Sequence, residues 1–250
     1  MIELKSARDR EKMRKAGRVA AEVLALLKSL TKSGMTTKDL DIIADREIRS
    51  RGGVPVFKGY HGYPASVCIS INEEVVHGIP GMRVLRSGDL VSIDLGATVD
   101  GFVGDTALSF FVDRAPDAQS EQLLRVTEES LYRGIGAAVV GGRLGDISYA
   151  VQQHVEAHGF AVVRDFVGHG IGREMHEEPQ VPNYGTPGRG ILLKSGLAIA
   201  IEPMVNLGGH EVDVATDGWT VTTRDHTLSA HFEHTIFLDE RGPEILTAIV

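Results

Sequence analysis

Two halves of the chain carry similar sequences at a nearly constant offset. An apolar run after Leu85–Gly88 ends in an acid at Asp94, and a matching run after Leu193–Gly196 ends at Glu202, 108 residues later. Further matches at offsets of 107 or 108 are Asp39 with Asp146, Gly52 with Gly159, and His61 with His169. The repetition indicates an internal duplication whose halves are related by a pseudo-two-fold axis, which would bring Asp94 and Glu202 toward each other.

The hydrophobic pattern predicts helix pairs that alternate with groups of strands. We expect helices from the N-terminal segment to residue 30, from 36 or 37 to the glycines at 52 and 53, and over about 117–139 and 146–158. We expect strands over 66–71, 90–99, 102–112, 160–167, 197–202, 219–223 and 231–238. This order is typical of an α+β fold. No Pro- or Ser-rich linker interrupts it, so we expect one domain over residues 1–250, with halves of about 1–115 and 116–250.

Charge and cysteine content narrow the class of protein. Lys and Arg number 26 and Asp and Glu number 34, a formal charge of −8, which argues against a protein built to grip nucleic acid. Cys68 is the only cysteine, so the chain forms no internal disulfide, and a reducing compartment is indicated. No apolar signal-peptide core or membrane-spanning run is visible near the N-terminus. We therefore expect a cytoplasmic protein without a membrane or specific nucleic-acid partner.

An acidic residue, Asp94, interrupts an otherwise apolar strand. A two-residue turn at Asp100–Gly101 would place Gly96 opposite Asp105 on the returning strand. Asp94 and Asp105 would then share one sheet face, one diagonal step of about 7–8 Å apart. Asp94 alone could be a hydrogen-bonded core carboxylate. Two buried carboxylates so close repel each other unless one is protonated or a cation lies between them.

Glu202, Glu233 and His169 extend this pattern. Glu202 follows an apolar strand, Glu233 lies between apolar residues, and His169 lies in a glycine-rich loop. Singly, they could be a strand end, a partner of a neighbouring histidine and a turn residue. Together with the two aspartates, they would gather a charge of about −4 that could not be buried without compensation. Two divalent cations would balance it, and oxygen ligands with one nitrogen suit Mn, Fe, Co or Zn.

Two further histidines, His77 and His176, lie in short motifs that end in proline. Each could be a solvated loop residue. Alternatively, each could act as a hydrogen-bond donor near a reacting carbonyl, because neutral histidine can donate or accept near pH 7.

In combination, these motifs resemble those of type I methionine aminopeptidases in the bacterial short form. The matching stretches, which cover nearly the whole chain, are Gly59–Pro64, Ser66–Asn72, His77–Pro80, Asp100–Asp105, Gly168–Gly172, His176–Pro179, Ile201–Met204, Asp217–Thr220 and Phe232–Thr235. The resemblance implies the pita-bread fold, whose pseudo-symmetric halves agree with the internal repeat. It also implies that two divalent metals are bound by Asp94, Asp105, His169, Glu202 and Glu233, with Asp105 and Glu233 bridging them.

The resemblance further implies roles in catalysis. In the family, a water held by the metals attacks the peptide carbonyl, and Glu202 would shuttle its proton to the leaving amine. His77 would contact the peptide beyond the scissile bond, and His176 would stabilise the tetrahedral oxygen. The pocket for methionine would be lined by Tyr60, Tyr63, Cys68, His77, Met175 and Trp219. Two positions depart from many bacterial relatives, Phe57 from a second pocket cysteine and Met175 from an aromatic residue.

The implied substrates are the deformylated N-termini of nascent polypeptides with a small second residue, and the expected state is a monomer. Alternatives are a proline-specific relative, a non-catalytic binding protein of the same fold, and a metal-free hydrolase resembling creatinase. The early position of Asp94 argues against the first, which usually has a long N-terminal domain. The complete ligand set and the net charge argue against the others.

The first 18 residues carry seven cationic and three acidic side chains, a local charge of +4. Such a run is usually a solvated helix face. Its functional alternative is a basic edge that docks weakly on ribosomal RNA near the exit tunnel, and such binding would weaken steeply with salt.

Overall fold

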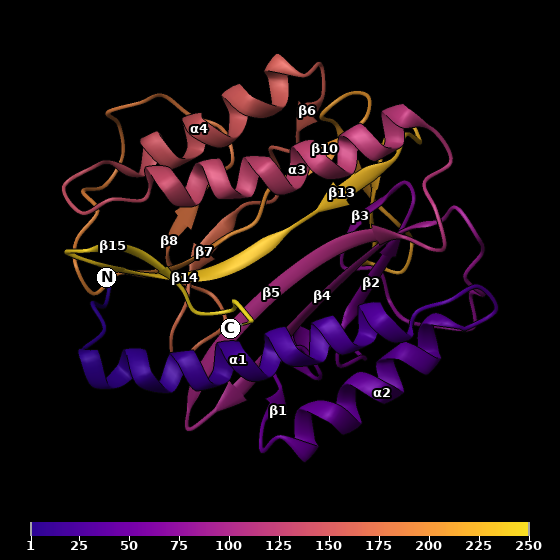
Figure 1. Cartoon of the computed structure of the whole chain (residues 1–250), viewed down its shortest axis with the longest axis horizontal. Coiled ribbons are helices and arrows are strands. Elements are labelled where there is room, and N and C mark those ends of the chain that lie inside the picture. Colours follow the sequence, from indigo (N-terminus) through magenta and orange to yellow (C-terminus); the bar gives the residue numbers. More distant parts are fainter. Residues whose placement is uncertain (1, 250) are drawn as a thin grey trace.

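Two helix pairs dominate the computed structural model, which describes residues 2–249. Within that range, the α-helices are α1 (Ala7–Leu30), α2 (Thr37–Ser50), α3 (Ala118–Ala137) and α4 (Leu144–Ala157), and a short 3₁₀ turn, η1, covers Tyr60–Gly62. Figure 1 shows α1 and α2 at the opposite edge of the view from α3 and α4, with the long strands running between them. None of the helices in the described range is both long and apolar enough to cross a bilayer.

Local sequence explains where the helices start. Ser6 caps α1 by accepting a hydrogen bond from the Asp9 amide, and the Asp9 carboxylate accepts one from the Ser6 amide. Thr36 and Asp39 form the same reciprocal capping box at the start of α2. Such boxes satisfy amides that have no partner within the helix, so they fix its first turn.

The main sheet runs in the order β1-β4-β5-β14-β9-β7-β8, with β2 on β4 and β15 on β14. Its strands are β1 (Val54–Pro55), β2 (Cys68–Ile71), β4 (Leu90–Val99), β5 (Phe102–Phe111), β7 (Gly168–Gly170), β8 (Glu177–Val181), β9 (Ala198–Ile201), β14 (Glu233–Asp239) and β15 (Gly242–Ile245). Gly96 pairs with Asp105 and Val99 with Phe102, which confirms the predicted hairpin register.

Two small sheets lie beside the main one. The first has the order β13-β10-β6, formed by Ser229–His231, Met204–Asn206 and Ala161–Val162, and the second has the order β11-β12-β3, formed by Val212–Val214, Val221–Thr223 and Glu74–Val76. Two predicted strands are therefore wrong as continuous elements. The run 160–167 contains only the two residues of β6, and the run 231–238 divides at Phe232 between β13 and β14, which belong to different sheets.

The helices bury one face of the main sheet. Ile93 and Leu95 of β4 pack into the cluster that contains the apolar residues of α1 and α2. Ile199 of β9 and Ile236 of β14 pack into the cluster that contains those of α3 and α4. Because side chains alternate along a strand, Asp94 and Glu233 point to the opposite face. The hydrophobic packing of both halves thus aims the acids away from the helices.

The sequence repeat recurs in the structure. The helices α2 and α4 each contain 14 residues and begin 107 positions apart. Leu85 donates its amide proton to the Met35 carbonyl, and Leu193 donates to the Gly142 carbonyl, at 2.8 and 2.9 Å. The turn glycines Gly88 and Gly196 have φ angles of +90° and +92°. The fold is therefore the expected α+β arrangement with an internal duplication, while the domain limits at residues 115 and 116 stay a prediction.

Candidate functional site

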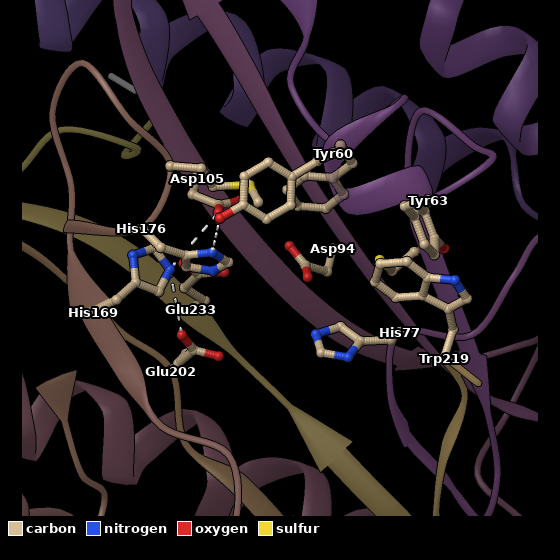
Figure 2. A pocket seen from close by; sticks show the side chains of 13 residues that line it. Tyr60, Tyr63, His77, Asp94, Asp105, His169, His176, Glu202, Trp219 and Glu233 are labelled. Carbon is tan, nitrogen blue, oxygen red and sulfur yellow. Dashed lines mark hydrogen bonds and ion pairs between the residues drawn. The ribbon is translucent and has the colours of Figure 1, made fainter. Parts of the chain in front are cut away.

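A cavity of about 110 Å³ is lined by side chains from both halves of the chain. Its lining comprises Phe57, Tyr60, Tyr63, Cys68, His77, Asp94, Asp105, His169, Met175, His176, Glu202, Trp219 and Glu233. These are the twelve residues predicted for the site together with Phe57. Figure 2 shows Asp94 between the group formed by Asp105, His169, Glu202 and Glu233 and the aromatic side chains of Tyr63 and Trp219.

Strand pairing sets the positions of three carboxylates. Ala107 of β5 pairs with Asp94 on one neighbouring strand and with Glu233 on the other, and Asp105 lies two residues away on the same strand. The Thr235 hydroxyl accepts a hydrogen bond from the Asp105 amide and donates one to the Asp105 carbonyl, at 3.0 and 2.8 Å. Adjacent strands thus hold the carboxylates around the small side chain of Ala107.

His169 presents a nitrogen to these acids. Ligand atoms of Asp105, His169 and Glu233 all lie within 4.8 Å of one another, and His169 Nε2 is 3.6 Å from Glu202 Oε1. Its other ring nitrogen, Nδ1, is 2.9 Å from the Gly170 carbonyl, so Nδ1 carries the proton and Nε2 is left as an acceptor. Burial lowers the pKa of His169 to about 3. The imidazole is therefore neutral at pH 7, the state that a metal ligand requires.

If ionised, the carboxylates of the site would be buried without enough hydrogen-bond or cationic partners for their charge. Asp94 Oδ1 and Glu233 Oε1 are buried without a hydrogen-bond partner among the described residues. Burial raises the pKa values of Asp94, Glu202 and Glu233 well above their ordinary range, and neighbouring carboxylates raise them further. Burial raises the pKa of Asp105 as well. Cations between these oxygens would remove both penalties, so the donor set fits a divalent metal centre.

His176 lies beside this group. The Tyr60 hydroxyl is 2.7 Å from His176 Nδ1, and the rings of His176 and His169 meet edge to face with centroids 4.4 Å apart. Burial lowers the pKa of His176, which keeps the ring neutral at pH 7. A neutral ring that accepts the Tyr60 proton at Nδ1 has its own proton at Nε2 and can donate a hydrogen bond from there.

The other end of the cavity is aromatic and fixed. The Tyr63 hydroxyl donates to the carbonyls of Val67 and Gly78, and its ring meets Trp219 edge to face at 5.1 Å. Cys68 pairs with Asp94 across β2 and β4, and burial raises the pKa of its thiol. A protonated, buried thiol is a small apolar wall rather than a nucleophile.

One polar residue near the site, His231, was not predicted. The sequence suggested that His231 or His234 could pair with Glu233, and this is wrong. His231 Nε2 is buried without a hydrogen-bond partner among the described residues and lies 3.8 Å from Glu202 Oε2. His234 instead bonds Thr247 at 2.8 Å. The sequence carries no signal for this contact, because His231 and Glu202 belong to segments far apart along the chain.

The basic N-terminal segment is largely neutralised by ion pairs. Of its seven cationic side chains, five pair with carboxylates: Lys5 with Glu177, Arg10 with Asp239, Arg14 with Glu244, Lys15 with Asp100 and Arg18 with Glu22. Lys12 lies over the ring of Phe102, at 5.4 Å from its centroid. These contacts favour the solvated helix face over a basic docking edge.

Comparisons with known proteins agree with this geometry. Residues 11–240 match the profile of metallopeptidase family M24. A methionine aminopeptidase of Clostridium perfringens is 53% identical over the full length of both chains. The crystal structure of a methionine aminopeptidase from Thermotoga maritima superimposes with a TM-score of 0.98 at 46% identity, over all of both chains. A prolidase from Pyrococcus furiosus, 20% identical, covers 99% of this chain with 66% of its own, at a TM-score of 0.79. These likenesses confirm the predicted pita-bread fold.

Proposed function

We propose, because this chain belongs to the methionine aminopeptidases of metallopeptidase family M24, that its pocket removes the N-terminal methionine of polypeptides with the help of two divalent cations. The observation that carries the metal proposal is the set of buried carboxylate oxygens without partners, gathered around a neutral imidazole. The same carboxylates and His169 disfavour a non-catalytic binding protein. The prolidase, at 20% identity, shares the fold without supporting proline specificity.

The proposed ligands divide by position. Asp105 and Glu233, which come from adjacent strands, would hold both cations. Asp94, His169 and Glu202 would complete the ligand set, and His169 Nε2 lies 3.6 Å from Glu202 Oε1. When bound, such cations polarise a carbonyl and lower the pKa of a water, producing a nucleophile at neutral pH. Mn, Fe, Co and Zn all suit this donor set.

We propose that Glu202 moves the proton. Its carboxylate lies beside the proposed ligand His169, with Oε1 3.6 Å from the imidazole Nε2, so it would be next to a water held at the cations. Glu202 would take the proton that a water loses as it attacks the peptide carbonyl, and would pass it to the leaving amine. His231, beside Glu202 Oε2, would limit the rotation of that carboxylate.

The two outer histidines would handle the peptide. His176 would donate a hydrogen bond to the oxygen that becomes negative during attack, because the Tyr60 hydroxyl fixes its tautomer. His77 would contact the peptide beyond the scissile bond. Burial lowers its pKa to about 4, so it would do so as a neutral ring.

We propose that the methionine side chain lies against the aromatic end. Tyr60, Tyr63, Cys68, His77, Met175 and Trp219 would form this subsite, which Phe57 extends. All of these side chains are uncharged at pH 7, as the partner of an unbranched thioether should be.

The proposed substrates are nascent polypeptides after removal of the formyl group, because a free α-amine is needed. We propose a monomeric enzyme in the cytoplasm, where a single buried thiol stays reduced. A ribosome contact would depend mainly on Arg8 and Lys12, because the other five cations of the segment pair with carboxylates. Co-sedimentation with ribosomes at low and moderate salt tests this contact, and an unchanged result after Arg8→Glu and Lys12→Glu would exclude it.

Peptide hydrolysis tests the proposed activity. Metal-free protein is incubated with Met-Ala-Ser or Met-Leu-Ser, with and without added Mn²⁺ or Co²⁺. We expect methionine release from Met-Ala-Ser only when metal is present, and much less from Met-Leu-Ser. Equal release in the presence of a chelator, or equal cleavage of both peptides, would contradict the proposal.

A further inference from the structure

A buried lysine, Lys5, lies against the loop that carries the site residues Met175 and His176. The Lys5 side chain is 1% exposed, and its Nζ is 2.6 Å from Glu177 Oε2 and 3.3 Å from Glu3 Oε2. The Glu177 side chain is 17% exposed, so the closer ion pair is largely shielded from water. Lysine is seldom buried unless it is paired, and loss of one partner leaves an uncompensated charge. The Lys5–Glu177 pair is thus expected to resist opening.

The second carboxylate oxygen of Glu177 accepts hydrogen bonds from the neighbouring loop. Glu177 Oε1 accepts hydrogen bonds from the amides of Arg173 and Glu174, at 2.8 and 3.3 Å. Met175 and His176, which line the cavity, lie between these amides and Glu177 in the sequence. One carboxylate therefore ties both the loop and Lys5 together, and charge-assisted bonds of this kind are stronger than neutral ones.

The same loop also packs closely against the Lys5 and Glu177 side chains. A side-chain carbon added at Gly172 would lie 2.3 Å from Lys5 Cε and 2.6 Å from Glu177 Oε1. A larger residue at position 172 would have to displace the ends of both side chains, so the glycine lets the ion pair lie against the backbone. The loop is therefore built around the ion pair.

The backbone of the N-terminal segment is anchored on the second half. The Lys5 amide donates to the Gly196 carbonyl at 2.7 Å, and a carbon added at Gly196 would meet the Lys5 carbonyl at 2.9 Å. The equivalent position in the first half, Gly88, faces open space within 4 Å. The two halves therefore differ at this position. The N-terminal segment packs on Gly196 in the half that contributes His176, and the equivalent Gly88 has no such neighbour.

We propose that Lys5 and Glu177 are positioning residues, which hold the loop 172–176 so that His176 meets the developing oxyanion and Met175 closes the methionine subsite. The proposal rests on the proposed function. Neither residue lines the cavity, so both act through the loop. Within the cavity, a hydrogen bond with Tyr60 holds the His176 ring. Outside the cavity, the Lys5–Glu177 ion pair holds the backbone of the loop that carries His176.

The test compares Lys5→Met with Lys15→Met. The first keeps most of the apolar stem and removes the ammonium group, and the second breaks an exposed pair with Asp100, 3.0 Å long, as a matched control. Limited trypsin digestion with mass spectrometry measures cleavage after Arg173, which reports loop opening without reference to activity. We expect Lys5→Met to speed this cleavage at least tenfold and to lower kcat on Met-Ala-Ser at least tenfold, with unchanged metal content. Lys15→Met should match the wild type in all three.

A kcat within threefold of wild type, with no faster cleavage after Arg173, would overturn the proposal. If Lys5→Met unfolds, Lys5→Met with Glu177→Met replaces it, because that pair leaves no buried charge unpartnered. The double variant should have a lowered kcat and faster cleavage after Arg173 at a temperature where it is folded, and wild-type values would equally overturn the proposal. Should the wild type release no methionine, the proposed function fails, while the digestion still shows whether the pair holds the loop.

Discussion

Relative to the Asp105→Asn variant, wild-type protein stripped of divalent metal should lose stability as the pH rises from about 5 to about 8. The comparison cancels the opposite contribution of buried histidines such as His77 and His169, whose lowered pKa values favour folding as the pH rises. Burial raises the pKa of Asp105 from 3.8 to about 7, so the folded protein keeps a proton that the unfolded chain has already lost. Such a carboxyl stabilises the fold at low pH, and the contribution disappears as the pH rises through the folded pKa. Burial raises the pKa values of Asp94, Glu202 and Glu233 in the same direction, so their contributions have the same sign.

The size of this pH effect on stability can be worked out from Asp105. Between about pH 5 and a folded pKa of about 7, the folded state holds about one more proton than the unfolded state over about two pH units. At about 1.4 kcal/mol per unit, the contribution of Asp105 to the free energy of unfolding falls by about 3 kcal/mol. For a domain of this length, that lowers Tm by roughly 6–12 °C.

Calorimetry in a chelator measures this slope. Metal-loaded protein should show the opposite trend, because bound cations keep the carboxylates ionised and protons compete with them at low pH. Asp105→Asn is the matched variant: an amide cannot ionise, so metal-free Asp105→Asn should be more stable than metal-free wild type at pH 8 while binding metal weakly. A difference in Tm between metal-free wild type and metal-free Asp105→Asn that stays constant, or shifts in favour of the wild type, as the pH rises over this range would refute the reasoning.

Three further changes probe individual side chains. Glu233→Gln should reduce kcat at least about 10²-fold and weaken metal binding, because an amide cannot replace a shared charge; activity within about tenfold of wild type, with normal metal content, would sink the ligand assignment. His176→Ala should lower kcat with little change in metal content, and metal loss as large as that of Glu233→Gln would show that His176 is a ligand. His231→Leu should lower kcat while His231→Gln, which keeps a donor near Glu202, retains most of it; equal kcat values in both variants would exclude an orienting role.

Much of the fold could be predicted because its signals are local or repeated. Capping residues such as Thr36 mark helix starts, and the Asp100–Gly101 turn fixes the register that sets Asp94 beside Asp105. Short strands were missed or merged, because two- or three-residue segments such as β6 carry no recognisable period. The division at Phe232 depends on which sheet accepts each segment, which is a tertiary choice.

The functional site, too, could be predicted from the sequence only in part. The acids were visible because carboxylates are unexpected on apolar strands, and the resemblance to a known family supplied their roles. His231 was misassigned because its neighbour in space, Glu202, is distant in sequence. The partner of Lys5 was hidden for the same reason: Glu177 lies 172 residues away along the chain. Long-range ion pairs leave no periodic pattern for sequence analysis to detect.

The central claim is that one cavity binds two divalent cations and uses them to release methionine. Titration of metal-free protein with Mn²⁺ or Co²⁺, with bound metal counted by native mass spectrometry and methionine release from Met-Ala-Ser measured on the same samples, tests it directly. The account predicts up to two bound ions per wild-type chain, activity that appears only with bound metal, and loss of both in Glu233→Gln. Full activity in chains that hold no metal, or metal bound equally well by Glu233→Gln, would contradict it.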